Sequence, residues 1–489
     1  MNTSTRFSLP RIVLLSSHAD ALKKHFESHP SGHERTAAVL FRRLQRSVSG
    51  LPDSDRYLSV DVVPFEDAWL TSSSSMHVDF ETKHLRDLFR RVEDEHLIFG
   101  FVHNHPGGTL EFSEKDDSNE ASLVKAIASR NGIESQLIAV LFSEGEWTAR
   151  LRTGQTPTTP TGIRHFSVLG TSYKVYGAQP PHQEVDEIFS RQMTAFGAPF
   201  THVMQSLRFV VIGNGGTGSP TASLLVRSGA GEVILIDYDP LEKTNLNRVQ
   251  GSRAKDIGEN KAVMLAKHLN EIGLPCSVVA VKGTIDSDLT AIEALSSADV
   301  IFGCTDDYLG REFLNSALYF YLQPLIDVGM GGRVGADHNG SMRLLNQKGR
   351  ISCILPEHGK CLFCQRELKD EWIEAQRAKR ANPEITKKEL KERYLEGGAE
   401  EAPGVAPFTG SLASLGVTTL FDLLVPHRRL PGELRADNIW IDFTNMEITS
   451  NLPIDNDECP YCGEHLFLAA SEKNGFLNRP ALNPKRGAK

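Results

Sequence analysis

The chain has 489 residues, of which 40% are hydrophobic and 24% charged, a composition typical of a globular protein too long for one ordinary core. Its net charge of −9, with no basic block before the last residues, argues against nucleic-acid binding, and no apolar run approaches the ~20 residues of a membrane helix. The polar N-terminus lacks the apolar stretch of a secretory signal, so we expect a cytoplasmic protein whose paired cysteines bind metal.

The N-terminal third shows a mixed α/β pattern. We expect helices at residues 19–27 and 81–92, and strands at residues 11–15, 37–41 and 97–102. The last strand leads into His103-Asn104-His105-Pro106, and Ser113-Glu114-Lys115-Asp116 follows after six residues. Because alternate residues of a strand share one face, His103 and His105 can bind the same metal ion.

Asp116 supplies a third ligand from the first turn of the next helix and leaves the fourth position for water, which is the pattern of a catalytic zinc site. Ser113 would lie beside that water and donate to an oxyanion. Glu34, in a Gly-His-Glu context, is the candidate general base, with Glu66 and Glu81 as alternatives. Taken alone, Ser113 to Asp116 also fits an ordinary helix N-cap.

This H-x-H-P-x6-S-x-x-D segment resembles the JAB/JAMM metallopeptidases, which cleave peptide or isopeptide bonds after ubiquitin-like C-termini. The resemblance implies zinc on His103, His105 and Asp116, with Glu34 as the base and Ser113 as the oxyanion donor. It also implies an α/β fold of the JAB/MPN type for residues 1–165.

A stretch rich in Pro, Thr and Gly follows this predicted domain, as in an extended linker. We predict a linker at residues 166–185 and a domain boundary near residue 180, although residues 165–168 could still add an edge strand to the first domain. Residues 186–489 then form a second domain.

The second domain carries a nucleotide-binding pattern. An apolar strand at residues 209–212 runs into Gly213-Asn214-Gly215-Gly216-Thr217-Gly218-Ser219, and a helix and a strand ending in Asp237 and Asp239 follow. Glycines between a strand and a helix let backbone N–H groups approach an anion, and Asp237, 24 residues after Gly213, stands where a ribose hydroxyl would bind. By itself this pattern also fits a tight turn that binds nothing.

Basic residues in the next segment favour an enzyme that cleaves ATP between its α- and β-phosphates, since such an enzyme needs fixed cations and a dehydrogenase does not. Asn245-Leu246-Asn247-Arg248 follows the acids, and Lys261 comes 13 residues after Arg248. A further apolar strand, at residues 299–303, leads to Asp306. Arg311, in the next helix, is assigned to a structural ion pair.

From about residue 187 to the C-terminus the chain resembles the ubiquitin-activating and ThiF/MoeB adenylating family. The resemblance implies a Rossmann-like doubly wound domain with ATP and Mg²⁺ as cofactors, in which Asp306 coordinates the magnesium. Phe189-Ser190-Arg191-Gln192, in a helix expected at residues 186–196, matches a family signature whose arginine reaches the γ-phosphate across a dimer interface. It therefore implies a homodimer, and an ATP site made of Gly213, Gly215, Gly216, Gly218, Asp237, Asp239, Asn245, Asn247, Arg248, Lys261 and Asp306, with Arg191 acting in trans.

Two CxxC pairs, with 94 residues between them, predict a structural zinc site made of Cys361, Cys364, Cys459 and Cys462. The charged segment at residues 365–400 is interpreted as a solvated helical insertion, with partner docking as an alternative role. The region where many ubiquitin-activating enzymes place a catalytic cysteine, residues 402–411, contains none. Cys353 is then the only candidate nucleophile, in an unpromising strand context, and direct transfer of the adenylate is the simpler inference.

The sequence thus predicts two activities suited to the same substrate end. The C-terminal domain adenylates the carboxylate of a ubiquitin-like protein with a diglycine-like C-terminus, and the N-terminal domain trims a precursor tail or reverses a conjugate, in a bacterial-type ubiquitin-like pathway. A conjugating-enzyme-like protein is a further candidate partner, whereas nucleic acid and membrane are not expected. The alternative is activation of a sulfur-carrier protein as a thiocarboxylate, and a non-catalytic scaffold is disfavoured because both sets of reactive residues are intact.

Overall fold

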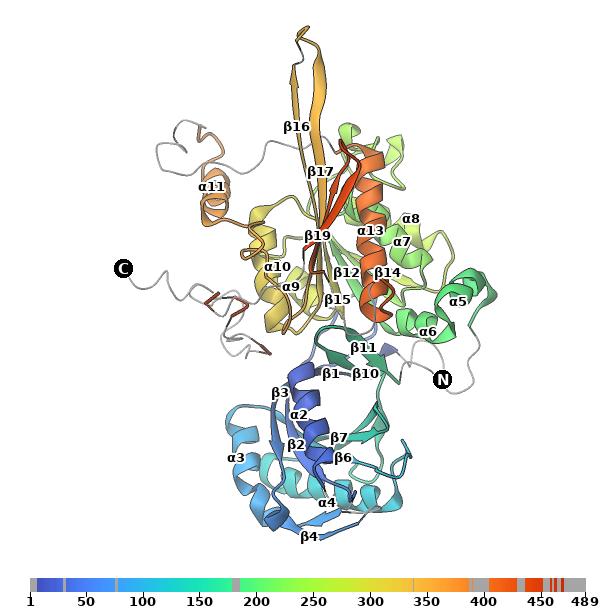
Figure 1. The fold of residues 1–489 in the computed structure, drawn as a ribbon, viewed down its shortest axis with the longest axis vertical. Coiled ribbons are helices and arrows are strands. Elements are labelled where there is room, and N and C mark those ends of the chain that lie inside the picture. The colour runs from blue at the N-terminus through green and yellow to red at the C-terminus, as the bar shows by residue number, and fades with distance from the viewer. Residues whose placement is uncertain are drawn as a thin grey trace. The chain divides into compact units, whose positions relative to one another are not determined.

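A computed structural model describes residues 7–29, 32–74, 78–177, 185–336, 338–386, 389, 404–428, 436–451, 458–459, 461–463 and 468–469 (Figure 1). The chain divides into two compact units, one formed by residues 1–46 and 52–184 and the other by residues 47–51 and 185–489. None of the helices in the described ranges is both long enough and apolar enough to cross a membrane.

The first unit is built on a nine-stranded mixed sheet in the order β11-β10-β1-β3-β2-β6-β7-β8-β9. Its strands are β1 (Arg11–Leu15), β2 (Thr36–Leu44), β3 (Arg56–Pro64), β6 (Ile98–Asn104), β7 (Gln136–Ser143), β8 (Glu146–Thr153), β9 (Thr161–Gly162), β10 (His165–Leu169) and β11 (Tyr173–Tyr176). A separate hairpin pairs β4 (Leu70–Ser73) with β5 (Val78–Phe80).

Helices pack on both faces of this sheet, and its central strands β6 and β7 are accordingly buried along most of their length. Helix α2 (Ser16–Glu27) belongs to one buried cluster through Leu22 and Phe26. Helices α3 (Arg86–Asp94) and α4 (Glu114–Asn131) belong to a second cluster with the other face of β6 and β7. Short 3₁₀ turns, η1 (Asp67–Trp69) and η2 (Thr82–Leu85), complete the unit.

The predicted linker begins too early in the chain. Residues 165–169 form β10, which pairs in parallel with β1, and residues 173–176 form β11 at the edge of the same sheet. The side chains of β10 are buried, so this segment is part of the core of the first unit. The alternative strand at residues 165–168 is thus confirmed, although it is not the edge of the sheet because β11 pairs beyond it.

The second unit contains an eight-stranded sheet in the order β14-β13-β12-β15-β16-β17-β18-β19. Neighbours from β14 to β16 are parallel and those from β16 to β19 are antiparallel. The strands are β12 (Arg208–Ile212), β13 (Glu232–Ile236), β14 (Ser277–Val281), β15 (Val300–Gly303), β16 (Leu325–Ala336), β17 (Met342–Ile354), β18 (Asn438–Asp442) and β19 (Glu447–Asn451).

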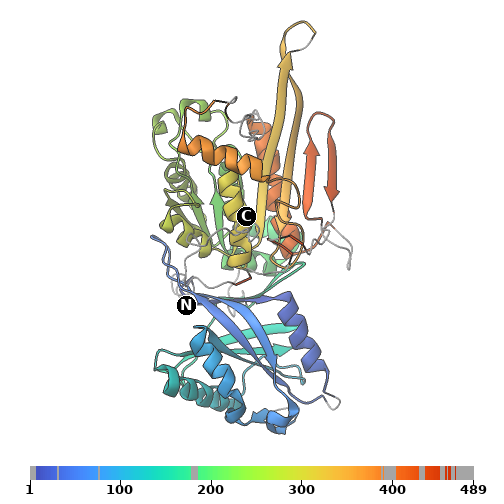
Figure 2. The ribbon, with the colours of Figure 1, turned by 90° about the vertical axis from the view of Figure 1, so that its left-hand side faces the viewer.

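Helices cover both faces of the parallel part of this sheet, as expected for a Rossmann-like α/β domain. Figure 1 shows α9 and α10 on one face, and α7, α8 and α13 on the other. Their bounds are α7 (Gly218–Arg227), α8 (Lys261–Asn270), α9 (Leu289–Ser296), α10 (Tyr308–Phe320) and α13 (Ala406–Leu424). The hairpin of β16 and β17 extends well beyond the helices in both views (Figure 2).

Other helices of this unit lie outside these two layers. The helix expected at residues 186–196 forms as η3 (Glu187–Phe189) followed by α5 (Ser190–Phe196), and α6 (Ala198–Ser206) comes next. The turns η4 (Lys243–Asn245) and η5 (Ala254–Asp256) lie between β13 and α8, and α11 (Asp370–Ala381) lies in the predicted insertion.

The chain order reverses beside β12. From β12 it passes to β13 and β14 on one side, and then returns to β15 and β16 on the other. In doubly wound sheets, ligands bind outside the carboxyl ends of the strands at this switch point. The glycine loop follows β12 and leads directly into α7, so it lies at this position.

Close approach of two backbone segments explains why Gly218 is required in this loop. A Cβ at Gly218 would lie 1.8 Å from the carbonyl oxygen of Gly213, whereas a Cβ at Gly215 would meet nothing within 4 Å. Gly213 itself has a φ of +81°, which favours glycine.

We predict that Gly218→Ala lowers the free energy of unfolding by about 2 kcal/mol, because the loop must shift to accommodate the methyl group. Gly215→Ala is the matched control and should change it by less than about 1 kcal/mol. Chemical denaturation of both variants measures the difference, and equal stabilities would contradict the loop geometry.

Candidate functional sites

The glycine loop is held by the carboxyl ends of its neighbouring strands. The amide of Gly213 donates to the carbonyl of Ile236 (2.9 Å), and the amide of Cys304 donates to Ile212 (2.8 Å). Thr217, which precedes α7, makes no side-chain cap to that helix. The N-terminus of α7 therefore lies where the helix can stabilise an anion.

Asp237 is buried at the end of β13 and fixes the loop. Its two carboxylate oxygens accept hydrogen bonds from the amides of Asn214 (2.6 Å) and Asp239 (2.8 Å). Burial raises the pKa of Asp237, although these hydrogen bonds oppose the shift. A carboxylate has about four acceptor positions, so Asp237 can still accept from a ribose hydroxyl.

Lys261 and Asp239 form an ion pair beside Asp237. Lys261 is the first residue of α8, and its Nζ lies 2.8 Å from Oδ2 of Asp239. The helix is capped by Asn260, whose side chain accepts from Val263 and donates to the carbonyl of Asp237 (3.0 Å). Because the lysine ammonium is held at the carboxyl edge of the sheet, it can neutralise a phosphate there.

Arg248 lies against the glycine loop. A Cβ at Gly216 would be 3.1 Å from Cδ of Arg248, which shows how closely the arginine stem approaches. Its guanidinium donates to the carbonyl of Thr244 (2.8 Å) and contacts Oδ1 of exposed Asn247 (3.5 Å). Asn245 is buried and has a structural part, because its side chain accepts from the amide of Glu242 and its carbonyl accepts from the amide of Arg248.

Asp306 follows β15 at the same edge and is exposed. β15 pairs with β12 so that Gly303 stands opposite Ile212, which brings the turn after β15 beside the glycine loop. The next residue, Asp307, caps α10 by accepting from the amides of Leu309 and Gly310. Asp306 is therefore the acid of this pair that does not cap the helix.

Arg191 lies on α5, which precedes β12 and the glycine loop in the chain. The helix is anchored by Phe189, which packs against Gly229, and by Gln192, whose side-chain amide donates to Thr201 (3.0 Å). Arg191 is exposed and makes no hydrogen bond or ion pair within the described residues.

A buried charge network lies beneath the Asp306 turn, and sequence reasoning assigned only its first member, Arg311. Asp327 on β16 is fully buried between Nε of Arg311 (3.4 Å) and the guanidinium of Arg350 (2.7 Å). Arg350 also pairs with Glu367 (2.8 Å), three residues after Cys364. The ion pair predicted for Arg311 is present, and the network connects α10 with the segment that follows the first CxxC pair.

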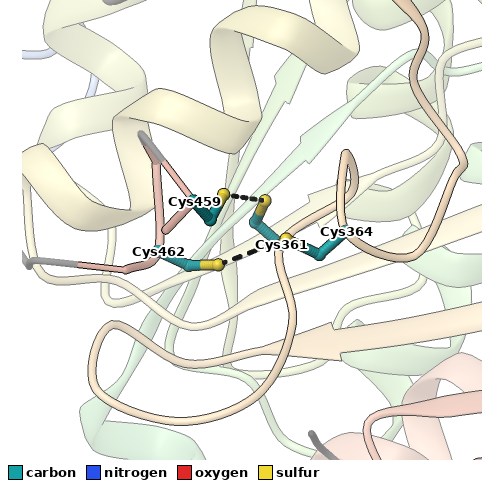
Figure 3. A group of neighbouring side chains, drawn as sticks. All are labelled: Cys361, Cys364, Cys459 and Cys462. Carbon is teal, nitrogen blue, oxygen red and sulfur yellow. Dashed lines mark hydrogen bonds between the residues drawn. The ribbon is translucent and has the colours of Figure 1, made fainter. Parts of the chain in front are cut away.

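The four paired cysteines converge, as predicted (Figure 3). The sulfurs of Cys361 and Cys459 lie 3.7 Å apart and those of Cys364 and Cys462 lie 3.6 Å apart, and all four fall within 4.8 Å of one another. Hydrogen bonding among the thiols raises the pKa of Cys361 well above its ordinary value. A divalent cation would neutralise thiolates so crowded, and a tetrahedral zinc site fits this donor set.

The remaining thiols are poorly suited to nucleophilic attack. Cys353 lies within β17 and is 1% exposed. Burial raises the pKa of both Cys276 and Cys304 to about 12. A reactive cysteine is usually accessible and has a lowered pKa, so none of the three has the environment of an acyl carrier.

In the first unit, His103, His105 and Asp116 form the second cluster able to hold a metal, with ligand atoms within 4.8 Å of one another. Nε2 of His103 lies 3.1 Å from Oδ1 of Asp116, and Nε2 of His105 lies 3.5 Å from its Oδ2. Nδ1 of His105 faces the carbonyl of Thr109 (3.1 Å), which turns Nε2 toward the cluster. All three residues are buried, and three such ligands leave one tetrahedral position open.

Asp116 is both a cluster member and a capping residue. Its carboxylate accepts from the amide (2.7 Å) and hydroxyl (2.8 Å) of Ser113, in a capping box that begins α4. Burial opposes ionisation, but the imidazoles of His103 and His105 beside the carboxylate hold the pKa of Asp116 well below its ordinary value. The N-cap and metal-ligand interpretations are therefore compatible, and the Ser113 hydroxyl is oriented toward the cluster through Asp116.

The structure places Glu34, rather than Glu66 or Glu81, beside the cluster. β2 pairs with β6 so that Thr36 stands opposite His103, and continuing this register by two residues brings Glu34 to His105. Oε1 of Glu34 lies 3.9 Å from Nε2 of His105, whereas Glu66 is exposed and Glu81 pairs with Lys83. Burial raises the pKa of Glu34 to about 7, although His105 opposes the shift.

A second buried network supports α4, and sequence reasoning missed it. Glu120 is fully buried and accepts from Arg150 (2.8 Å) and Arg152 (2.6 Å) of β8. The Arg150 guanidinium also stacks on Phe112, whose ring lies 6.1 Å from that of His103. The acid four residues after Asp116, on the same helix face, was the available signal.

Comparison with known proteins identifies the second unit. The protein-family model described as "ThiF family" matches residues 189–461. The chain is 32% identical over 155 residues to "Adenylyltransferase and sulfurtransferase MOCS3" of Dictyostelium discoideum, a match covering 32% of this chain and 33% of that protein. It is 31% identical over 152 residues to "SAMP-activating enzyme E1" of Haloferax volcanii, covering 31% of this chain and 54% of that protein.

The chain thus spans about a third and about half of the lengths of these two relatives. Among solved structures, E. coli MccB is 21% identical with a TM-score of 0.44, covering 57% of this chain and 76% of that one. Because the family model covers more than half of the 489 residues, the chain belongs to the ThiF family.

Proposed function

We propose that the second unit uses ATP to adenylate the C-terminal carboxylate of a ubiquitin-like or sulfur-carrier protein. The observation that carries this proposal is the meeting of the glycine loop, Asp237, Lys261, Arg248 and Asp306 at one switch point. The names of the two curated relatives, an adenylyltransferase and an activating enzyme, support the same reaction class.

In this mechanism the substrate carboxylate attacks the α-phosphate in line and pyrophosphate leaves. The chain supplies no covalent group, so its part is to position ATP and neutralise growing charge. Asp237 binds the ribose, the loop amides and Arg248 hold the phosphates, and Lys261 exchanges its contact with Asp239 for a phosphate oxygen. Asp306 would hold Mg²⁺, which supplies further charge neutralisation when bound.

We further propose a homodimer in which Arg191 reaches the γ-phosphate of the partner subunit's ATP. The exposed position of Arg191, on a helix anchored by its neighbours, supports this role. The buried position of Cys353 supports direct transfer from the adenylate to an acceptor.

For the first unit we propose a zinc-dependent peptidase of the JAB/JAMM type, which processes the tail of the same partner or removes its conjugates. His103, His105 and Asp116 would hold the zinc, which supplies an activated water when bound. Glu34 would take the proton from that water, and Ser113 would orient Asp116 and donate to the oxyanion. The convergence of these side chains from the end of β6, the start of α4 and the residues just before β2 supports the proposal.

Activation of a sulfur carrier is the second candidate, favoured by the sulfurtransferase in the name of one relative. Conjugation joins the activated carboxylate to an amine, whereas sulfur transfer leaves a thiocarboxylate. The mass of the partner's C-terminus, measured after reaction with ATP in the presence and absence of a sulfur donor, distinguishes the two products.

We predict that Lys261→Ala and Asp306→Ala each lower ATP–pyrophosphate exchange by about 10²-fold or more, because each removes a charge that stabilises the phosphates or the magnesium. Lys267→Ala is the matched control, since Lys267 lies on the same helix and pairs with Glu259 at the surface. Wild-type exchange in either site variant would contradict the adenylation assignment.

For the peptidase, Glu34→Gln should retain zinc but lower cleavage of a linear fusion to the partner's C-terminus by about 10²-fold or more, because the amide cannot accept the proton. Glu66→Gln, an exposed upstream glutamate, should behave as wild type. The peptidase proposal fails if zinc-loaded wild-type protein leaves the fusion intact, and the role of Glu34 fails if both variants cleave equally.

Zinc at the four cysteines is tested by Cys361→Ser. We expect this variant to lose one equivalent of zinc and to unfold at lower denaturant concentration, since metal binding contributes directly to folding. Cys276→Ser, at a thiol outside the cluster, should keep the full metal content. Unchanged zinc content in Cys361→Ser, by elemental analysis, would rule out the site.

A further inference from the structure

The helix of the predicted insertion is not solvated on all sides. In α11, Ile373 and Ala375 are buried, and the Trp372 ring lies 5.4 Å from that of Tyr308. Figure 2 shows α11 in orange, crossing the end of α10 in yellow. The predicted helix is present at residues 370–381, but its short apolar face is buried, so the solvated interpretation holds only for its other side. Residues 387, 388 and 390–400 lie outside the described residues.

The contact between the two helices is specific and polar. Oε1 of Gln376 accepts from the amides of Tyr308 (2.7 Å) and Leu309 (3.2 Å), the first two residues of α10. Asp307 accepts from Leu309 (3.3 Å) and Gly310 (3.0 Å). The opening turn of α10 is thus held by its own cap and by a side chain from about 70 residues away.

Arg380 adds a charge contact one turn further along α11. Its guanidinium pairs with Asp286 and lies 3.7 Å from Oδ2 of Asp307. Asp307 is thereby occupied by two backbone amides and a cation, while its neighbour Asp306 is exposed. Of these two adjacent acids, Asp307 is used to hold the helix and Arg380, whereas Asp306 remains exposed to bind a metal.

We propose that Gln376 and Arg380 are positioning residues for magnesium-bound ATP. They fix the turn after β15 so that Asp306 faces the metal and Asp307 does not. The insertion then forms part of the nucleotide site. This proposal rests on the adenylation function proposed above.

The same helix pair offers a matched control. Arg377 lies one turn from Arg380 and pairs with Glu312 (2.5 Å), further along α10. It attaches α11 to α10 without touching the turn. If α11 served only to cover α10, then loss of Arg377 and loss of Arg380 should have similar effects.

The test compares binding of ATP with and without Mg²⁺ by titration calorimetry, in the full-length protein. We expect Gln376→Leu and Arg380→Gln to weaken binding of MgATP by about tenfold, which corresponds to one or two lost hydrogen bonds. The affinity for ATP without Mg²⁺ should stay within about twofold of the wild-type value. Arg377→Gln should leave both affinities unchanged. Arg380 is partly exposed, so its variant is expected to fold even if that of Gln376 does not.

Hydrogen exchange gives a second readout. The amides of Tyr308 and Leu309 should exchange faster in Gln376→Leu than in wild type and remain unchanged in Arg377→Gln. The positioning role would be overturned if the variants bound ATP equally more weakly with and without Mg²⁺. It would also be overturned if Arg377→Gln weakened MgATP binding as much as Arg380→Gln. If wild-type protein binds no ATP and Lys261→Ala leaves ATP–pyrophosphate exchange unchanged, then the adenylation proposal fails instead.

Discussion

The second unit depends on the parallel pairing of β12 with β13 on one side and β15 on the other. This pairing aligns the carboxyl ends of the three strands and so brings together segments that begin at residues 213, 237 and 304. The amides of Gly213 and Cys304 are used to hold the loop in place. The strand pairing alone therefore brings together acids and cations that are far apart in the sequence.

Both candidate sites rest on buried carboxylates that are paired with arginines. Asp327 lies between Arg311 and Arg350 beneath the Asp306 turn, and Glu120 lies between Arg150 and Arg152 beneath Asp116. Removing one partner of such a pair leaves an uncompensated buried charge, which typically costs about 3–5 kcal/mol. The role of these networks is structural rather than catalytic. They restrict the rotation of the helices α10 and α4.

The two proposed activities require opposite treatment of a protein C-terminus. A peptidase releases a carboxylate, and an adenylating enzyme consumes one, so a single partner could be the substrate of both. The chemical strategies also differ. In the proposed sites, the first unit would hold one metal and a base in a buried cluster, whereas the second would use Lys261 and Arg248, which lie near the glycine loop, to neutralise a highly charged nucleotide.

The sequence by itself determined the glycine loop, the two CxxC pairs and the His103–His105–Asp116 spacing, because each depends on residues a few positions apart on one strand, turn or helix. Tertiary structure decided what depends on long-range register. It placed Glu34 rather than Glu66 or Glu81 at His105, added residues 165–176 to the first sheet, and docked α11 on α10. Local spacing fixes which side chains share a face, but only the packed sheet fixes which faces meet, so the sequence indicated Arg311 but not the partners that complete either arginine network.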